Sequence, residues 1–237
     1  MCRVLGITNF DYFRHQKIVE RFCELARSGV VMAEDPPGHE DGWGLAFYQE
    51  GQLVVHKSGA SLLEETDKVL GILSTLKSSP LMILHLRKSA WGDRYSTRHA
   101  HPFHHNNTVF FHNGVVYDYR GLIPDINLPG LGADALDTEV FFYHFMSGKG
   151  QDLGRAFLDT AALIKRKHKY SALNCLFSDG VKFFAYRDYA KEPDYYSLYK
   201  AFSENSCLIS SEPLDEDIRW EMMAQEEFLM IDLDTGT

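Results

Sequence analysis

The sequence predicts a layered α+β protein, because its helix-like and strand-like segments come in groups. Strand-like segments dominate both ends of the chain, and two consecutive helix-like segments lie between them. A regular alternation of single strands and single helices, which would predict a parallel sheet, is absent from the pattern. The 237 residues suffice for one large domain or two small ones, and no linker or repeat divides them.

The first third of the chain contains a predicted strand, a helix and a pair of strands. Residues 3–9 have the pattern of a short strand. Residues 15–28 carry apolar side chains along one helical face, which predicts an amphipathic helix that ends before Gly29. Residues 43–48 and 53–57 predict two strands that form a hairpin.

The middle of the chain begins with a helix and continues into a strand and a loop. Ser61 and Glu64 have the spacing of a capping box, so a helix is expected from there to about residue 77. The mostly apolar residues 81–87 predict a strand. Residues 98–107 are rich in histidine and are expected to be irregular.

The remaining segments are a strand, a loop, two helices and a second group of strands. Residues 108–117 predict a strand, and the prolines and glycines of residues 123–133 predict a long loop. Residues 138–146 and 153–167 predict two successive helices. Five further segments predict strands: residues 171–177, 181–187, 197–202, 206–211 and 228–233.

Composition and charge exclude several classes of protein. With 45% hydrophobic residues, the chain is typical of a globular protein. A net charge of −9 argues against nucleic acid or an anionic membrane as the main partner. No apolar run approaches the roughly 20 residues of a membrane span, and no signal peptide is apparent, so the cytoplasm is the expected location. The composition leaves the oligomeric state open.

Cys2 is the first residue that could carry chemistry. If Met1 is removed, the α-amine of Cys2, with a pKa of about 8, can act as a base beside its own thiol. The thiol is a strong nucleophile once it loses its proton, so one residue would supply both groups. The alternative is an ordinary cysteine after the initiator methionine, which position alone favours.

Arg87 and Asp137 could each bind one end of a charged ligand. Arg87 ends a predicted strand, where a guanidinium can bind a carboxylate with two hydrogen bonds, although a solvated arginine is the commoner case. Asp137 precedes an apolar helical run, so it could cap the helix or hold an ammonium group.

Asn113 and Gly114 follow a strand-like run and allow two interpretations. Asn-Gly is the leading two-residue hairpin turn, and sequence alone favours a hairpin here. In the alternative interpretation, the Asn amide and the Gly N–H donate hydrogen bonds to a developing oxyanion.

Five of the eleven histidines lie between His99 and His112, so a metal site has to be considered. Their spacing matches no zinc template, and the four cysteines lack a CxxC pair. A polar segment near a cleft is the favoured interpretation, and a histidine-rich metal-binding protein is the alternative. No nucleotide-binding or serine-hydrolase motif is present, so no metal and no cofactor is expected.

The order of these motifs resembles the class II glutamine amidotransferases, which are N-terminal-nucleophile hydrolases, and most closely their small stand-alone branch. The similarity extends from Cys2 to about Leu214 and implies one domain, residues 1–237. The motifs that carry it are Met1-Cys2, His39-Glu40-Asp41-Gly42-Trp43-Gly44, His85-Leu86-Arg87, His101-Pro102-Phe103, His112-Asn113-Gly114, Asp137-Thr138-Glu139 and Ser210-Ser211-Glu212-Pro213-Leu214.

The resemblance implies a four-layer αββα sandwich of two antiparallel sheets covered by helices. It implies that Cys2 attacks the side-chain amide of glutamine, releases ammonia and forms a γ-glutamyl thioester that is then hydrolysed. Asn113 and Gly114 would form the oxyanion hole. Arg87 would bind the substrate α-carboxylate, and Asp137 would bind its α-ammonium group.

Two departures from the family pattern leave the substrate and the acceptor of ammonia open. Many members have a Thr-His pair where this chain has Ala90 and Trp91. Many also have an appended synthase domain, which the 237 residues leave no room for, so ammonia transfer would need a separate synthase subunit. The alternatives are a hydrolase of another γ-glutamyl amide or peptide, without ammonia transfer, and a non-catalytic regulatory subunit.

Overall fold

Two antiparallel sheets form the centre of the molecule. The computed structural model describes residues 2–148, 152–203 and 205–235. One sheet has the strand order β11-β9-β10-β1-β4-β2-β3, and the other has the order β12-β8-β7-β6-β5. The strands of the first sheet are β1 (Arg3–Asp11), β2 (Trp43–Gln49), β3 (Gln52–Ser58), β4 (Ser78–Leu86), β9 (Tyr199–Phe202), β10 (Cys207–Ser210) and β11 (Glu221–Met222). Those of the second are β5 (Phe103–His105), β6 (Thr108–Asn113), β7 (Asn174–Ser178), β8 (Lys182–Arg187) and β12 (Glu227–Asp232).

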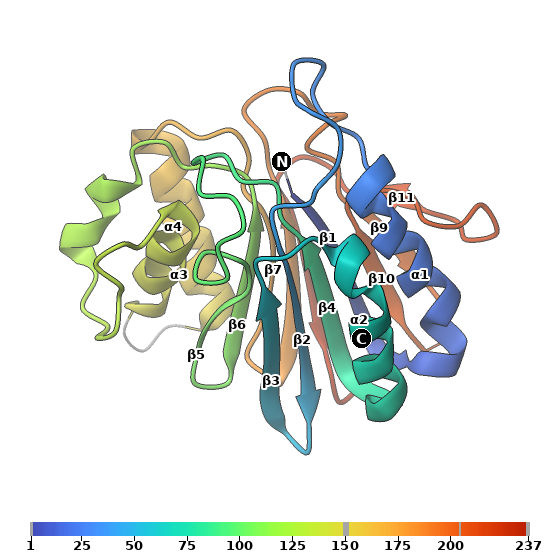
Figure 1. The fold of residues 1–237 in the computed structure, drawn as a ribbon. Helices are drawn as coiled ribbons and strands as arrows, with labels where there is room; N and C mark the ends of the chain where they lie inside the picture. Colours follow the sequence, from blue (N-terminus) through green and yellow to red (C-terminus); the bar gives the residue numbers. More distant parts are fainter. Residues whose placement is uncertain (1, 149–151, 204, 236–237) are drawn as a thin grey trace.

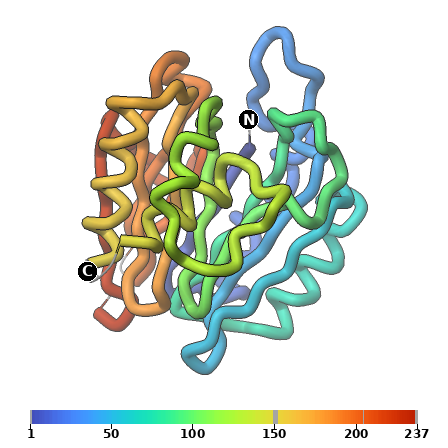
Figure 2. The backbone as a smooth tube through the Cα atoms, turned by 90° about the vertical axis from the view of Figure 1, so that its left-hand side faces the viewer, coloured from blue at the N-terminus to red at the C-terminus, as the bar shows by residue number. Residues whose placement is uncertain are grey.

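Helices cover the outer face of each sheet, which makes four layers (Figure 1). The helices are α1 (Tyr12–Ser28), α2 (Leu62–Leu76), α3 (Asp137–Met146), α4 (Leu153–Lys167) and the short 3₁₀ helix η1 (Tyr119–Asp125). In Figure 2, α4 and α2 lie on opposite sides of the strands. The αββα arrangement of two antiparallel sheets and covering helices is therefore confirmed.

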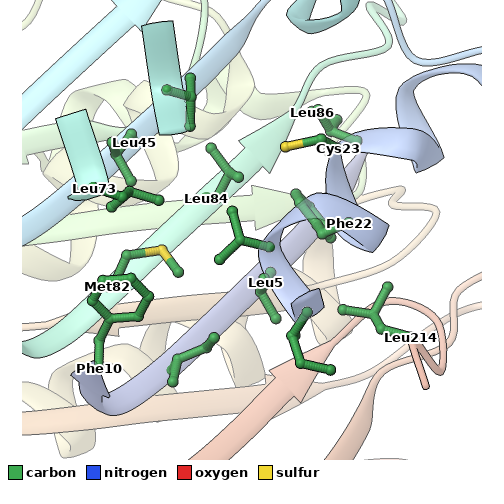
Figure 3. Close-up of a cluster of buried hydrophobic side chains, with 14 of the residues drawn as sticks. Leu5, Phe10, Phe22, Cys23, Leu45, Leu73, Met82, Leu84, Leu86 and Leu214 are labelled. Carbon is green, nitrogen blue, oxygen red and sulfur yellow. The ribbon is translucent and has the colours of Figure 1, made fainter. Parts of the chain in front are cut away.

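Successive side chains of each strand point to opposite faces of its sheet, so buried side chains form three layers of hydrophobic core. In β1, Leu5 and Ile7 face α1 and α2, whereas Val4 belongs to the cluster between the two sheets. Figure 3 shows the first of these clusters, with Leu5 of β1 and Phe22 of α1 close together. A third cluster, rich in phenylalanine, fills the space between the second sheet and α3 and α4. Each sheet thus packs against helices on one face and against the other sheet on its second face.

Most predicted elements are present, with differences at their ends. The helix expected over residues 153–167 is α4. The first helix begins earlier than predicted, because Asp11 Oδ1 accepts a hydrogen bond from the backbone of Arg14 at 3.0 Å and caps it. Residues 98–107 are not wholly irregular, since β5 pairs there with β6. The loop predicted from residue 123 overlaps η1.

The strand predicted over residues 108–117 ends at Asn113, so the hairpin expected at Asn113 and Gly114 is wrong. The neighbours of β6 in its sheet are β5 and β7, and the residues after Gly114 pair instead with a distant segment. Val115 donates its backbone N–H to Ser171 Oγ at 3.0 Å, and Val116 forms a bridge with Tyr170. The chain therefore leaves the sheet at Gly114 rather than turning back.

Among the helices that the structure describes, none has the length and apolar character of a membrane span.

Candidate active site

A small cleft of about 40 Å³ brings together candidate residues from four parts of the chain. Cys2 precedes β1, Arg87 follows β4, Gly114 follows β6, and Asp137 begins α3; all four line the cleft. The pairing of Arg3 with Leu86 across β1 and β4 brings the start of the chain beside Arg87. Asn113 does not line the cleft, but it directly precedes Gly114 and is 1% exposed.

The Cys2 thiol is buried beside the backbone of Lys88. Cys2 Sγ lies 3.4 Å from the Lys88 backbone nitrogen and 3.6 Å from its carbonyl oxygen. Burial raises the pKa of the Cys2 thiol, and the Lys88 N–H and the charges of Arg87 and Arg3 oppose that rise. A base is therefore needed to form the thiolate at neutral pH. Met1, whose removal the nucleophile hypothesis requires, lies outside the described residues.

The buried guanidinium of Arg87 binds a carboxylate of the chain itself. Its Nη2 donates to both carboxylate oxygens of Asp93, at 2.8 and 2.7 Å, and its Nη1 donates to the Asp93 carbonyl oxygen at 2.8 Å. Ser89 Oγ donates to the same carboxylate at 2.5 Å. The pKa of Asp93 is lowered, because these hydrogen bonds and the Arg87 charge outweigh its partial burial.

Asp137 faces the cleft as the first residue of α3, and it does not cap the helix. Leu136 is the N-cap residue, so the capping role that the sequence allowed for Asp137 is wrong. Its Oδ1 accepts a hydrogen bond from Trp91 Nε1 at 2.9 Å, and its Oδ2 accepts one from the backbone of Val116 at 2.9 Å. Burial raises the pKa of this carboxyl group, and nearby His112 opposes that rise.

The backbone at Gly114 passes too close to the backbone of Ala172 for any side chain. A Cβ atom at Gly114 would overlap the carbonyl oxygen of Ala172 and approach His112 Nε2 at 2.6 Å. Glycine is therefore required by close approach rather than by a turn. The Asn113 side-chain amide is buried, and neither its nitrogen nor its oxygen has a hydrogen-bond partner among the described residues. Buried polar groups in proteins are usually hydrogen-bonded, so the unpaired amide of Asn113 is an exception.

The histidine-rich stretch forms part of the wall of the cleft. His99, His101 and His112 line it, and the rings of His85 and His101 lie 4.2 Å apart between centroids. Burial lowers the pKa of His85, His101 and His112, so these rings are neutral at physiological pH. Within residues 2–148, 152–203 and 205–235, no group of three or more His, Cys, Asp or Glu side chains is arranged to hold a metal ion.

Three contacts of residues that line the cleft were not anticipated from the sequence. Asp93 and Ser89 are in contact with Arg87, and the Trp91 indole is in contact with Asp137. All three lie in the irregular stretch between β4 and β5, where no periodicity or spacing reveals which way a side chain points. The departure from the family pattern at Trp91 was the one available signal.

The four-layer fold is that of an N-terminal-nucleophile amidotransferase domain. The chain belongs to the family of class-II glutamine amidotransferases, because the model of that family matches residues 1–199. An uncharacterized protein of Methanocaldococcus jannaschii is 31% identical over 205 residues, which are 80% of this chain and 51% of that protein. The chain thus spans about half the length of this relative.

Solved structures show the same fold at low sequence identity. Glutamine phosphoribosylpyrophosphate amidotransferase from B. subtilis superposes with a TM-score of 0.72 at 18% identity, over 99% of this chain and 48% of that one. A glutamine aminotransferase class-II domain protein from Silicibacter pomeroyi gives a TM-score of 0.63 at 19% identity, over 98% and 96% of the two chains. At these identities the comparison supports the fold alone.

Proposed function

We propose that this protein is a glutamine-hydrolysing enzyme of the amidotransferase type, with Cys2 as its nucleophile. The observation that carries the proposal is the meeting of Cys2, Arg87, Gly114 and Asp137 in one cleft. These residues supply a thiol, a cation, a backbone donor and an anion. A zwitterionic amino acid with a terminal amide needs all four of these groups.

In the proposed mechanism, removal of Met1 frees the α-amine of Cys2, which takes the proton from the thiol. The sulfur attacks the amide carbon of glutamine, and Asn113 Nδ2 and the Gly114 N–H donate to the resulting oxyanion. The proton then passes from the α-ammonium group of Cys2 to the leaving nitrogen, and ammonia departs. The same α-amine then takes a proton from a water molecule, which attacks the γ-glutamyl thioester. Glutamate leaves, and the Cys2 thiol is restored.

The head group of the substrate would bind at the end of the cleft formed by Arg87 and Asp137. Arg87 would bind the α-carboxylate, as it now binds the carboxylate of Asp93. Asp137 would accept hydrogen bonds from the α-ammonium group, and the cation would favour the ionised carboxylate that burial opposes. We further propose that residues 1–237 act as one amidotransferase domain. Its ammonia would pass to a separate synthase subunit or be released into solution.

The test of this function is glutamate release from glutamine by the purified protein, together with intact-mass analysis. We expect the mass of a chain without Met1, and one adduct on Cys2 after treatment with a glutamine-mimicking diazoketone. Cys2→Ala should lower kcat by at least about 1000-fold, because the nucleophile is lost. The matched control is Cys23→Ala, which removes a buried thiol of α1 outside the cleft and should keep its activity. Retained turnover in Cys2→Ala would disprove the mechanism.

A second cavity favours a related function, the hydrolysis of a larger γ-glutamyl amide or peptide. This cavity has a volume of about 420 Å³ and shares Lys88, Ser89, Ala90 and Val115 with the cleft, so the two are adjacent. A bulky group on the amide nitrogen could enter it. Comparison of kcat/KM for glutamine and for γ-glutamyl peptides decides between the two substrates. A clear preference for glutamine would exclude the larger amide.

A further inference from the structure

One short segment of the chain reaches both ends of the proposed head-group site. Residues 87–102, all of which are described, contain neither a helix nor a strand between β4 and β5. In this segment, Gly92 has a φ of 74°, which lets the chain reverse between Trp91 and Asp93. Trp91 then points to Asp137 and Asp93 points to Arg87.

The contacts of Asp93 are those that a substrate carboxylate would make. Its two carboxylate oxygens lie 2.8 and 2.7 Å from Arg87 Nη2, in a charge-assisted pair with a guanidinium that is 3% exposed. His99 Nδ1 lies 2.7 Å from the same carboxylate. Asp93 therefore neutralises the buried charge of Arg87.

The contact of Trp91 is the counterpart at the other end. Its Nε1–H donates to Asp137 Oδ1 at 2.9 Å, where an ammonium group would donate. The indole also packs edge-on against Tyr119, with ring centroids 5.5 Å apart, yet Trp91 remains 38% exposed. With both contacts made, the cleft keeps a volume of about 40 Å³.

We propose that Asp93 and Trp91 determine specificity by occupying the head-group site until a substrate displaces them. The inference rests on the proposed function, because it assigns the head-group site to Arg87 and Asp137. A ligand with a free α-carboxylate and a free α-ammonium group replaces both internal contacts. A ligand that lacks one of these groups displaces only one of the two internal contacts, so it gains only one of the two ion pairs that glutamine would form.

Two truncated amides separate the two contacts. Glutaramic acid has the carboxylate of glutamine without the ammonium group, and 4-aminobutanamide has the amine without the carboxylate. Asp93→Asn should lower the KM for glutamine and for glutaramic acid about tenfold, with kcat unchanged, because the internal competitor for Arg87 is weakened. The KM for 4-aminobutanamide should not change. Trp91→Phe should give the opposite pattern for the two truncated amides.

The matched control is Asp159→Asn, which removes another carboxylate that pairs with an arginine. Asp159 of α4 pairs with Arg155 at 3.0 Å, neither residue lines the cleft, and the Asp159 side chain is 44% exposed. This variant should leave every KM unchanged. Equal effects of Asp93→Asn on both truncated amides, or a higher KM for glutamine, would overturn the proposal.

A binding measurement separates this inference from the proposed function. In the Cys2→Ala background, calorimetry measures glutamine affinity without turnover, and Asp93→Asn should tighten binding about tenfold. Tighter binding without turnover in the wild type would support displacement and disprove the catalytic proposal. Turnover with unchanged affinity would disprove displacement alone. If neither Cys2→Ala nor the double variant with Asp93→Asn bound glutamine, both the displacement and the proposed function would be disproved.

Discussion

Asn113 and Asn174 face each other across β6 and β7, yet their side chains are in opposite situations. Asn174 Nδ2 donates to the Tyr196 carbonyl oxygen at 3.0 Å, and its Oδ1 accepts from the Asp188 backbone at 3.1 Å. The amide of Asn113 is equally buried and has no such partner in the described part of the chain. A buried amide without partners costs stability, which is consistent with the proposed role of Asn113 as an oxyanion donor.

Substitution of these two asparagines should therefore separate catalysis from stability. Asn113→Ala should lower kcat by about 100- to 1000-fold, through loss of an oxyanion donor, and change the free energy of unfolding by less than about 1 kcal/mol. Asn174→Ala should lower the free energy of unfolding by about 1–3 kcal/mol, because its two backbone partners stay buried. Glutamate release and urea denaturation provide the measurements. Full kcat in Asn113→Ala would remove the oxyanion role.

At the scale of an element, α2 is anchored to the first sheet through a departure from regular helix geometry. Glu65 has φ −118° and ψ 17°, which are not helical values. This conformation lets Glu65 Oε2 accept a hydrogen bond from Nε1 of fully buried Trp43 in β2 at 2.8 Å, while Lys68 Nζ lies 2.8 Å from Oε1. The hydrogen bond from Lys68 is the largest of the interactions that lower the pKa of Glu65 to about 2.

Removal of this anchor should destabilise the protein in a pH-dependent way. Glu65→Ala leaves the Trp43 indole N–H unpaired and should lower the free energy of unfolding by about 1–3 kcal/mol at neutral pH. Because the folded-state pKa is depressed, the contribution of Glu65 is present above its unfolded value near 4.5 and is lost as pH falls through about 2.

The difference in stability between the wild type and Glu65→Ala should accordingly shrink between about pH 5 and about pH 2, as measured by urea denaturation. The control is Glu64→Ala, an exposed neighbour in the same helix turn, which should change stability by no more than about 0.5 kcal/mol. A difference that stays constant with pH would show that the charge of Glu65 is not involved.

At the scale of the whole molecule, the two sheets pack closely at Gly6, which lies opposite large side chains of the facing sheet. A Cβ atom at Gly6 of β1 would lie 2.9 Å from Phe183 Cζ and 3.1 Å from Leu176 Cδ1 in the facing sheet. The close approach matters for the candidate site, because Cys2 directly precedes β1 and β6 of the facing sheet ends at Asn113. The two sheets hold the proposed nucleophile and one oxyanion donor.

Gly6→Ala should therefore force the sheets apart and lower the free energy of unfolding by about 1–3 kcal/mol. Gly71→Ala is the matched control, because Gly71 lies in α2 with nothing within 4 Å of the added Cβ atom. It should raise the free energy of unfolding by about 0.5–1 kcal/mol through better helix propensity. Thermal unfolding measures both effects, and equal stability of the two variants would contradict this account of the sheet spacing.

Much of the architecture could be predicted from sequence, because periodicity and capping depend on residues close together in the chain. The helix over residues 153–167 shows this directly: its apolar face repeats at helical spacing, and Asp152 accepts a hydrogen bond from the Arg155 backbone at 3.2 Å. The layered α+β class followed from the grouping of the segments, and the αββα sandwich followed from the family resemblance; the two antiparallel sheets confirm both. Prediction was weaker for β11, a two-residue strand too short to leave a pattern.

Polar partners, by contrast, depend on segments that meet only in the folded molecule. An Asn-Gly pair looks the same in a hairpin and at the end of a strand, and the approach of Ala172 to Gly114 excludes a side chain there. Likewise, the sequence identified Arg87 as a ligand for a carboxylate, but the path of the chain between β4 and β5 brings Asp93 to it. Local pattern therefore determined the elements and the candidate residues. Long-range packing decided their partners, because hydrogen bonds and ion pairs form between neighbours in space.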